Sequence, residues 1–435
     1  MDNQSLALVP ALPLANSPAS SLPPWSLGRR VAFRFAFVYL GLYSFPFPLT
    51  QLPKGEKIAE PWDWVMHHVV PWFGKHALHI TRDISFTPNG SGDTTYDYVT
   101  LAASLLFALV ATAVWSILDR RRPRYELGWT LLVIYTRYVL AATMAGFGFS
   151  KIFVQQFSPP TFLRLIQQYG DSSPMGLLWT FMGASVPYTI FAGTAELAGG
   201  ALLLFRRTTL LGALVLLGVM GNVVLLNLCY DVPVKLYSSH LWLMALFLTL
   251  PNMRRLYDFF IRQRAIQPAP VDTPFVGKRW RWARPILKTA FIVSLVYQQG
   301  YQQYQQGKQY AAGPQGAMSG AWDVVSVTRD GRPAEPGWRR VVITNGTFGY
   351  RQNDDRRQVF SLVDDGAKKT LTLTPFEDPK APASIVKYAR VGDQATLDGT
   401  LDGKPLHLEL RYIDTSKSLL MTRGFHWINE TPFNR

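Results

Sequence analysis

The chain has 435 residues, of which 48% are hydrophobic and 17% charged, and its formal net charge is +15. This length exceeds the usual size of one globular domain, so two structural units are expected. Because the Lys and Arg residues form short clusters between hydrophobic runs, with no continuous basic face, the composition argues against nucleic-acid binding. Cys229 is the single cysteine, which excludes an intramolecular disulfide and a CxxC redox pair.

Hydrophobic runs dominate the chain after residues 1–28, which are expected to be a disordered cytoplasmic N-terminus. A helix needs about 20 apolar residues to cross the core of a lipid bilayer. Residues 29–305 are therefore predicted to form a multi-pass α-helical membrane bundle of about seven spans. The spans are expected near residues 31–48, 97–118, 127–151, 187–205, 208–229, 236–250 and 285–304.

Basic clusters between the spans predict the orientation of the bundle. They are Arg29-Arg30, Arg120 to Arg124, Arg206-Arg207 and a cluster from Arg254 to Arg284. With seven spans and a cytoplasmic N-terminus, every cluster falls on the cytoplasmic side, as membrane insertion favours. The sequence thus predicts a protein of the cell inner (plasma) membrane whose C-terminal domain lies outside the cytoplasm.

Two of the predicted outer loops are long. The loop 49–96 is rich in aromatic residues and contains four histidines, which we expect at the membrane interface rather than around a metal ion, because no Cys or zinc motif accompanies them. In the loop 152–186, the apolar stretch 175–186 is too short to cross a membrane. It is expected to form a re-entrant or interfacial helix.

From residue 316 onward, short runs that alternate apolar and polar residues predict a separate all-β domain, 316–435. Eight strands are expected, at 323–329, 339–344, 347–352, 358–363, 370–374, 385–390, 395–401 and 406–412. Turn signals such as Asp330-Gly331 and Asp402-Gly403 separate them. This pattern is typical of a small antiparallel barrel or sandwich.

The β domain opens with Gly320-Ala-Trp322. This opening resembles the Gly-x-Trp start of lipocalin-type barrels, in which the Trp closes the bottom of the barrel and a late Arg packs over it. The resemblance implies a lipocalin-like barrel, with Arg423 as the equivalent Arg. The alternative is a generic β domain with a buried Trp.

The chain ends in Arg423-Gly-Phe-His-Trp-Ile-Asn-Glu-Thr-Pro-Phe-Asn-Arg435. Most chain ends are polar and loose. This tail combines Trp427 and other apolar residues with His426 and Glu430, so we expect it to dock, either as a cap on the barrel or on the outer face of the bundle. A direct role of the tail in chemistry is the alternative.

Ionisable side chains within apolar spans are costly and are therefore candidates for a functional site. Arg34 lies near the end of the first span and is expected to extend to the cytoplasmic surface. Arg137 and Glu196 lie in the middle of the third and fourth spans. We expect them to form an ion pair, structural or functional, and the small residues of Gly193–Gly200 to allow close helix approach.

A second set of polar residues lies toward the outer side of the predicted bundle. Its members are Lys151, Asn222, Asn227, Asp231, Lys235 and His240. His240 is the only histidine clearly within a span, so a haem with two histidine ligands is not expected. No metal site is predicted. The sequence identifies no cofactor, and a quinone is the candidate.

Three motifs carry a resemblance to a known family. They are Arg137 with Phe147-Gly-Phe-Ser-Lys151, then Glu196-Leu-Ala-Gly-Gly200 followed by Arg206-Arg207-Thr, and Gly221-Asn222 through Asn227. Through them, residues 130–255 resemble the DoxX-like membrane proteins and their broader relatives, the horizontal-transmembrane domain of vitamin K-dependent carboxylases and the lipase maturation factors. The Arg-Gly-Phe-His-Trp-Ile-Asn-Glu tail is similar to that of longer DoxX-like bacterial proteins.

DoxX-like proteins are linked to quinone-dependent sulfur oxidation and to thiol redox complexes, so the resemblance implies a redox context. Two hypotheses follow. In the first, the protein is an accessory in envelope redox chemistry that binds a quinone or lipid, with Arg137 and Glu196 at its polar end. In the second, it is a non-catalytic scaffold or assembly factor whose β domain binds an envelope protein or a lipid. A transporter is disfavoured because no internal repeat is found.

Overall fold

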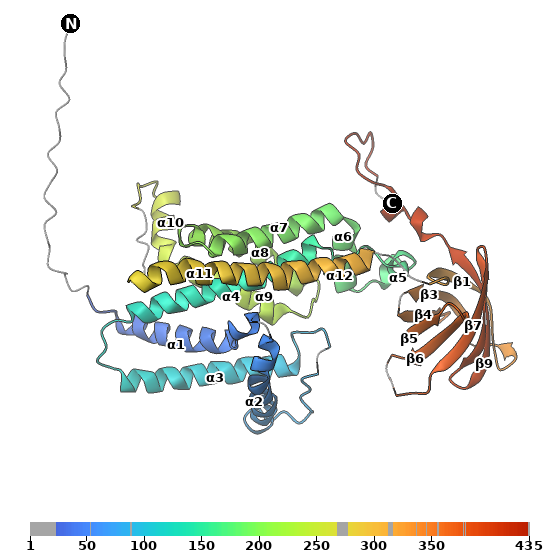
Figure 1. Cartoon of the computed structure of the whole chain (residues 1–435), viewed down its shortest axis with the longest axis horizontal. Coiled ribbons are helices and arrows are strands. Elements are labelled where there is room, and N and C mark those ends of the chain that lie inside the picture. The colour runs from blue at the N-terminus through green and yellow to red at the C-terminus, as the bar shows by residue number, and fades with distance from the viewer. Residues whose placement is uncertain are drawn as a thin grey trace, which may run out of the picture.

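The computed structural model describes residues 23–433 except 53, 88, 268–276, 312–315, 336, 345, 355, 377 and 379. It shows a bundle of long helices with a β-barrel at one end (Figure 1). The helices of the bundle are α1 (Leu27–Ser44), α2 (Gly55–His76), α3 (Thr95–Leu118), α4 (Glu126–Ile152), α5 (Phe162–Leu165), α6 (Pro174–Ala184), α7 (Val186–Leu203), α8 (Thr209–Cys229), α9 (Lys235–Thr249), α10 (Met253–Phe260), α11 (Lys278–Leu295) and α12 (Gln302–Ala311).

Each predicted span falls on a helix, but the count of seven spans is not confirmed. Within the described residues, four helical segments are long and apolar enough to cross a membrane: Leu27–Gln51, Thr95–Leu118, Glu126–Ile152 and Arg206–Cys229. The pair α6 and α7, bent by 98°, adds a fifth if it forms one span. Helix α9 has 15 residues and is too short, and α11 begins with a basic stretch. These candidate spans are those of a membrane protein.

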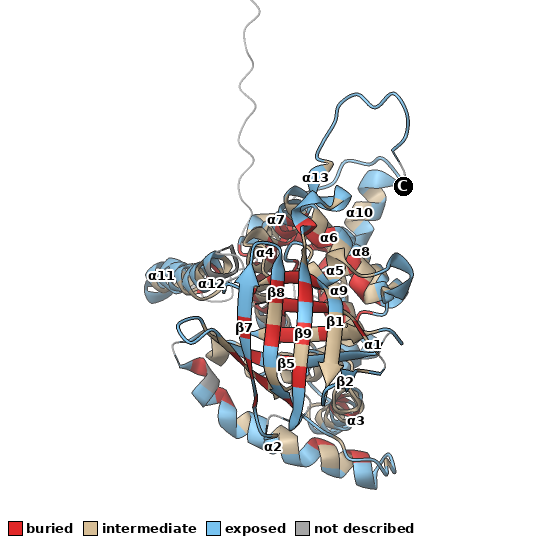
Figure 2. Ribbon diagram, turned by 90° about the vertical axis from the view of Figure 1, so that its right-hand side faces the viewer, coloured by how far each residue is buried: buried red, intermediate tan, exposed pale blue. Residues whose placement is uncertain are grey.

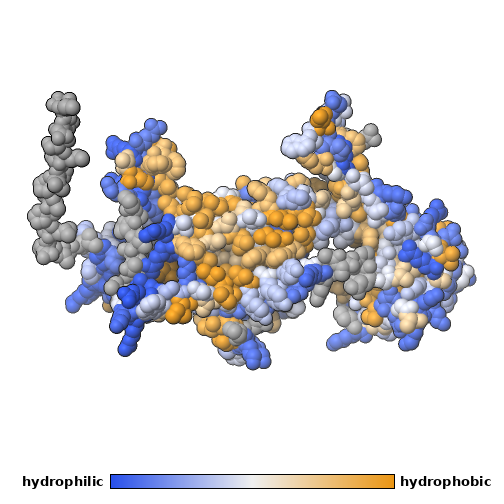
Figure 3. All heavy atoms as spheres, turned by 45° about the horizontal axis from the view of Figure 1, so that its top comes forward, coloured by the Kyte–Doolittle hydropathy of each residue, from blue (hydrophilic) through white to orange (hydrophobic). Residues whose placement is uncertain are grey.

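On the face shown in Figure 3, an apolar belt covers the bundle, and hydrophilic residues gather at the end opposite the barrel. The predicted basic clusters all lie at this end, because α1, α4, α8 and α11 begin there and α3 and α7 end there (Figure 1). Arg30 donates hydrogen bonds to the carbonyls of Arg120 and Arg122. The clusters therefore share one end of the bundle, and that this end faces the cytoplasm stays a prediction.

The chain is ordered before residue 29, where disorder was expected. Trp25 is buried, and its indole N–H donates to Glu126 over 3.1 Å. Residues 1–22 lie outside the described part. Arg34 also differs from the expectation, because it is 1% exposed and bonds to Tyr125, Ser116 and the carbonyl of Asp119 instead of reaching the surface. Both residues fasten α1 to the α3–α4 turn.

Glycines bring α4 and α7 into close contact. A Cβ on Gly148 would lie 2.9 Å from the carbonyl oxygen of Gly193, and one on Gly193 would lie 2.7 Å from the carbonyl oxygen of Gly148. Further along, a Cβ on Gly200 would meet Met144 at 2.9 Å. These distances are shorter than real Cβ contacts, so the two backbones approach as closely as only glycine permits. The predicted role of the small residues in α7 agrees with this packing.

The β domain is a closed antiparallel barrel of eight strands, as predicted. The strands are β1 (Gly320–Arg329), β3 (Trp338–Thr344), β4 (Thr347–Gln352), β5 (Arg357–Asp365), β6 (Thr370–Pro375), β7 (Ser384–Val391), β8 (Gln394–Leu401) and β9 (Lys404–Ile413), and β2 (Arg332–Pro333) extends the β1 hairpin. Neighbours in sequence pair with each other, and β1 pairs with β9 to close the barrel. Asp330-Gly331 and Asp402-Gly403 take positive φ angles in their turns, as hairpin turns of this type require.

Side chains fill the interior of the barrel. Buried and more exposed residues alternate along several strands (Figure 2), and Trp322, Phe348, Leu371 and Leu397 are among those fully buried. An eight-stranded barrel has an interior just wide enough for side chains to fill. The expected partner of Trp322 is wrong: Arg390, and not Arg423, lies over its ring, at 5.0 Å.

The barrel rests on the loop between α4 and α6. Arg351 of β4 forms a 2.6 Å ion pair with Asp171, and Arg340 of β3 donates to the carbonyl of Ile166. Asp171 and Ile166 both belong to the predicted outer loop 152–186. This loop therefore positions the barrel at the end of the bundle.

The C-terminal tail differs from the expectation that it docks. After α13 (Leu419–Thr422), the tail leaves the barrel and extends beside the bundle (Figure 1). Trp427 is 91% exposed, and Arg423 contacts His426 and Asn429 within the tail itself. Glu430 is exposed as well. Neither the barrel nor the helices bury this segment.

Truncation of Trp322 should destabilise the barrel. Its side chain is fully buried, and its N–H donates to the carbonyl of Met318 over 3.0 Å. We expect Trp322→Ala to lower the free energy of unfolding of the barrel by about 3–5 kcal/mol. The measurement is urea-dependent proteolysis of the full chain in mild detergent. Val391→Ala, at a side chain that is 82% exposed, is the control and should change it by less than about 0.5 kcal/mol.

Candidate functional site

A buried ion pair joins α4 to α7. Lys151 Nζ donates to Glu196 Oε2 over 2.7 Å, and both side chains are less than one-tenth exposed. Lys151 Nζ also lies 5.4 Å from the ring centre of Phe147 and 5.9 Å from that of Phe157. In these surroundings each charge depends on the other, because an unpaired buried charge is costly.

The expected pair of Arg137 with Glu196 is therefore wrong. Arg137 Nε and Nη2 donate to the carbonyl oxygen of Leu203 over 3.0 and 2.7 Å. Leu203 is the last residue of α7, so Arg137 binds the end of the helix whose middle carries Glu196. A cation at this position also interacts favourably with the helix dipole.

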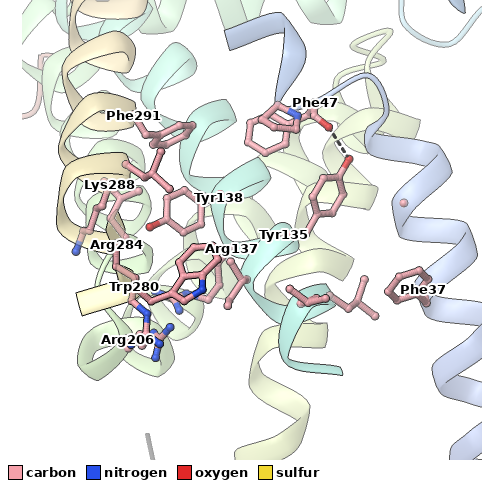
Figure 4. Close-up of a pocket in the computed structure, with 17 residues that line it drawn as sticks. Phe37, Phe47, Tyr135, Arg137, Tyr138, Arg206, Trp280, Arg284, Lys288 and Phe291 are labelled. Atoms are coloured by element: carbon pink, nitrogen blue, oxygen red, sulfur yellow. Dashed lines mark hydrogen bonds between the residues drawn. The ribbon is translucent and has the colours of Figure 1, made fainter. Parts of the chain in front are cut away.

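Arg137 lines a cavity of about 780 Å³ between α1, α4 and α11, which we call the basic cavity. Figure 4 shows its cationic side chains on the side of α11, with Trp280 among them, whereas Phe37 of α1 lies across from them. The basic residues of the lining are Arg137, Arg206, Arg284 and Lys288. Among the described residues that line the cavity there is no Asp or Glu.

The cations of the basic cavity differ in their contacts. Lys288 Nζ lies 3.5 Å from the ring centre of Phe205. Arg284 Nε and Nη2 are buried without a hydrogen-bond partner among the described residues. A buried guanidinium with unsatisfied N–H groups is unfavourable unless an acceptor reaches it. The basic cavity thus has the electrostatics of an anion site.

The rest of the basic cavity is lined mostly by apolar and aromatic side chains. Phe47, Tyr138 and Phe291 form part of it, and the hydroxyl of Tyr135 donates to the carbonyl of Phe47 over 3.1 Å (Figure 4). Phe47 also lines a second cavity of about 480 Å³ nearer the barrel, which includes Gln299 among its polar residues. The basic cavity therefore offers a charged end and an apolar wall to one ligand.

The other predicted site residues do not form one cluster with Arg137 and Glu196. Asn227 donates to Ser238 over 2.9 Å and ties α8 to α9, whereas Asn222 is exposed. Lys235 pairs with the exposed Asp231 at 2.8 Å. Asp93, which sequence reasoning missed, accepts the backbone N–H groups of Lys235 and Leu236 and so caps α9.

His240 of α9 is buried and belongs to an aromatic group with two tyrosines of α1. Its Nε2 lies 2.6 Å from the hydroxyl of Tyr39, and its ring stacks on Tyr43 at 4.1 Å between centres. Its Nδ1 lies 2.7 Å from the carbonyl of Leu236. His240 is therefore held on both ring nitrogens. The described residues contain no group of three or more His, Cys, Asp or Glu side chains that would hold a metal ion.

Sequence reasoning missed Arg284 and Lys288 as site residues, because it assigned the first only to a basic cluster at the membrane surface. A signal was present: the two residues are four apart, so they lie on one face of a helix. Arg206 was likewise interpreted as an orientation signal. In the structure all three meet Arg137 at the basic cavity.

Comparisons with known proteins give one informative match. No family model matches the chain, and no solved structure matches it. The chain is similar to the uncharacterized protein YwoB of Bacillus subtilis, with 31% identity over 145 residues. The matched region is 33% of this chain and 87% of YwoB.

The Lys151–Glu196 pair should show the energetics of a buried ion pair. Lys151→Met leaves a carboxylate without its partner and should lower stability by about 3–5 kcal/mol, and Glu196→Gln should also destabilise. The double variant Lys151→Met/Glu196→Met should regain most of the loss. The stabilities of the wild-type protein and the variants are compared by thermal unfolding in mild detergent. Arg254→Met, at an exposed 3.9 Å pair with Asp258, is the control.

A double variant as unstable as Lys151→Met alone would contradict this account. It would mean that the lysine stabilises the bundle by packing and not by its charge.

Proposed function

The chain belongs to the family of the uncharacterized protein YwoB, and from the lining of the basic cavity we propose a function: the helical domain binds a membrane lipid with an anionic head group there. The head group lies among Arg137, Arg284 and Lys288, and the acyl chains follow the apolar wall. This assigns the protein to lipid-binding membrane proteins and leaves any catalytic activity open.

The positive charge of Arg137, Arg284 and Lys288 at the basic cavity carries this proposal. Four basic residues line it, and none of its described lining residues is acidic. The contrast with Lys151 is direct, because that buried cation has its carboxylate within the chain at 2.7 Å. Basic pockets between membrane helices bind anionic lipid head groups, which supply the missing negative charge. The phosphate of such a lipid would accept from the unpartnered N–H groups of Arg284.

Size and access also support a lipid. A cavity of about 780 Å³ lies within the range that holds a ligand of several hundred daltons. Leu131 and Leu287 line it and are themselves exposed on the bundle, so acyl chains have a lateral way in from the bilayer. Trp280 and the other aromatic residues suit the boundary between head group and chains.

A quinone, the cofactor candidate from the sequence, suits the basic cavity less well. Its head is neutral and offers carbonyl acceptors, so it would leave the charges of Arg284 and Lys288 uncompensated. The redox role implied by the DoxX resemblance stays a prediction. Glu196 was expected at the polar end of the ligand, but its carboxylate accepts a hydrogen bond from Lys151 instead.

A scaffold whose β domain binds an envelope protein is the second candidate. One observation limits where such a partner would bind: the barrel interior is filled by its own side chains, among them Trp322, Phe348 and Leu408. A lipocalin-like ligand inside the barrel therefore has no support here. Any partner would bind the outer surface of the domain.

Mass spectrometry of the full chain in mild detergent tests the proposal. We expect the wild-type protein to retain an anionic lipid in stoichiometric amount. Each charge-assisted hydrogen bond contributes about 1.5–3 kcal/mol, so Arg284→Gln/Lys288→Gln should weaken retention by at least about tenfold. The matched control Arg254→Gln/Arg262→Gln removes two charges at exposed side chains outside the basic cavity and should retain the lipid.

Two outcomes would contradict the proposal. Equal lipid retention by the cavity variant and the control would mean that the lipid is bulk material, and the scaffold would become the better hypothesis. A stoichiometric quinone without anionic lipid would move the assignment to the redox accessory.

A further inference from the structure

The C-terminal tail, residues 419–433, exposes nearly all of its apolar side chains. Phe425, Trp427 and Ile428 are each more than three-quarters exposed. Leu419, Leu420 and Met421 of α13 and Phe433 are exposed as well. So dense a group of exposed apolar residues in one segment marks a surface that another apolar phase covers.

The polar side chains of the tail bond to one another. Arg423 Nη2 donates to Asn429 Oδ1 over 2.7 Å, and Arg423 Nη1 lies 3.2 Å from His426 Nε2. Asn429 Nδ2 donates to the carbonyl of His426 over 3.2 Å, and the guanidinium of Arg423 lies 4.5 Å from the ring centre of Phe433. The polar side chains thus form one hydrogen-bonded cluster that stays open to solvent, beside apolar side chains that are equally exposed.

The position of the tail indicates which apolar phase covers it. In Figure 3 the apolar tip of the tail lies level with the barrel-side end of the apolar belt. In Figure 1 the tail turns back from the barrel toward α6 and α7, and Figure 2, along the bundle, shows it outside the outline of the helices. The tail therefore lies beside the bundle, level with the barrel-side end of its apolar surface.

Helices α6 and α7, and α2 on the opposite side of the bundle (Figure 1), also expose aromatic side chains. Phe181 of α6 and Phe191 of α7 are exposed at the bent corner between these helices. Helix α2 runs across the bundle axis (Figure 1) and exposes Trp64 and Trp72. Aromatic residues of this kind gather where the head groups meet the acyl chains.

We propose that the C-terminal tail inserts its apolar side chains into the head-group boundary of the membrane on the barrel side, in the same bilayer that its own helices cross. Trp427 and Phe425 occupy the boundary, Ile428 reaches the first acyl carbons, and the Arg423–Asn429 core stays hydrated. The tail then fastens the barrel at a second point, away from the Asp171–Arg351 ion pair. This role is independent of lipid binding in the basic cavity.

Spin labelling of the full chain in vesicles of phosphatidylcholine and phosphatidylglycerol tests this inference. The single cysteine is first removed by Cys229→Ser, and a nitroxide is then placed at Ile428→Cys. Collision rates with oxygen, which concentrates in lipid, and with a water-soluble nickel chelate are compared. Control labels go to Val391→Cys on the barrel and Leu225→Cys on the apolar face of α8, both exposed side chains.

We expect the oxygen-to-nickel ratio at residue 428 to exceed that at residue 391 several-fold and to approach that at residue 225. A ratio equal to that at residue 391 would place the tail in water and overturn the proposal. Dipolar broadening between labels at residue 428 would also overturn it, because it would show that a second copy of the chain covers the tail. A second label at Phe425→Cys repeats the test in case the first variant perturbs the tail.

Discussion

The close contact of α4 with α7 is the constraint on which the bundle depends. Gly148 and Gly193 remove the side chains that would separate the two backbones, and Lys151 and Glu196 then meet at 2.7 Å. The same contact fixes the register of the antiparallel pair, which brings Arg137 opposite the last residue of α7. Helix α8 continues the pattern, because a Cβ on Gly212 would lie 2.8 Å from the carbonyl of Gly199. The helices are thus held by backbone proximity, and buried charge is tolerated only where this proximity supplies a partner.

The two charged positions of α4 differ in how they are neutralised, and this difference carries the functional argument. Arg137 and Lys151 are fourteen residues apart, or about 21 Å along the helix at 1.5 Å per residue. Lys151 is neutralised by the carboxylate of Glu196. Among the described residues, Arg137 donates to the carbonyl at the end of α7, and α11 brings Arg284 and Lys288 to the same cavity, whose described lining contains no Asp or Glu. A structural role for Arg137 as a helix cap accounts for its own bonds, but it leaves the unpartnered atoms of Arg284 unexplained.

The sequence predicted elements well and contacts poorly, for a physical reason. Strand alternation and turn residues such as Asp402-Gly403 are local signals, so all eight strands were placed and the closed barrel followed. Pairing between helices depends on register, which hydropathy does not encode. Arg137 and Lys151 lie on the same helix, and nothing local distinguishes which of them faces Glu196. Likewise, Arg390 and Arg423 were equally available to cover Trp322 until the strand order placed Arg390 on β7 near it.

The two ends of the bundle carry different chemistry, and this difference bears on how an anionic lipid would be selected. The basic clusters and the basic cavity share one end, whereas the exposed aromatic residues of α2, α6 and the tail lie toward the other. Clustered Lys and Arg residues raise the local concentration of anionic lipids at the membrane surface before any of them enters a pocket. On our proposal, the surface field would enrich the lipid class, and Arg284 and Lys288 within the basic cavity would select a single molecule with its head group between α4 and α11. The aromatic residues at the far end would then fix the depth of the bundle in the bilayer and keep the basic cavity level with the head groups.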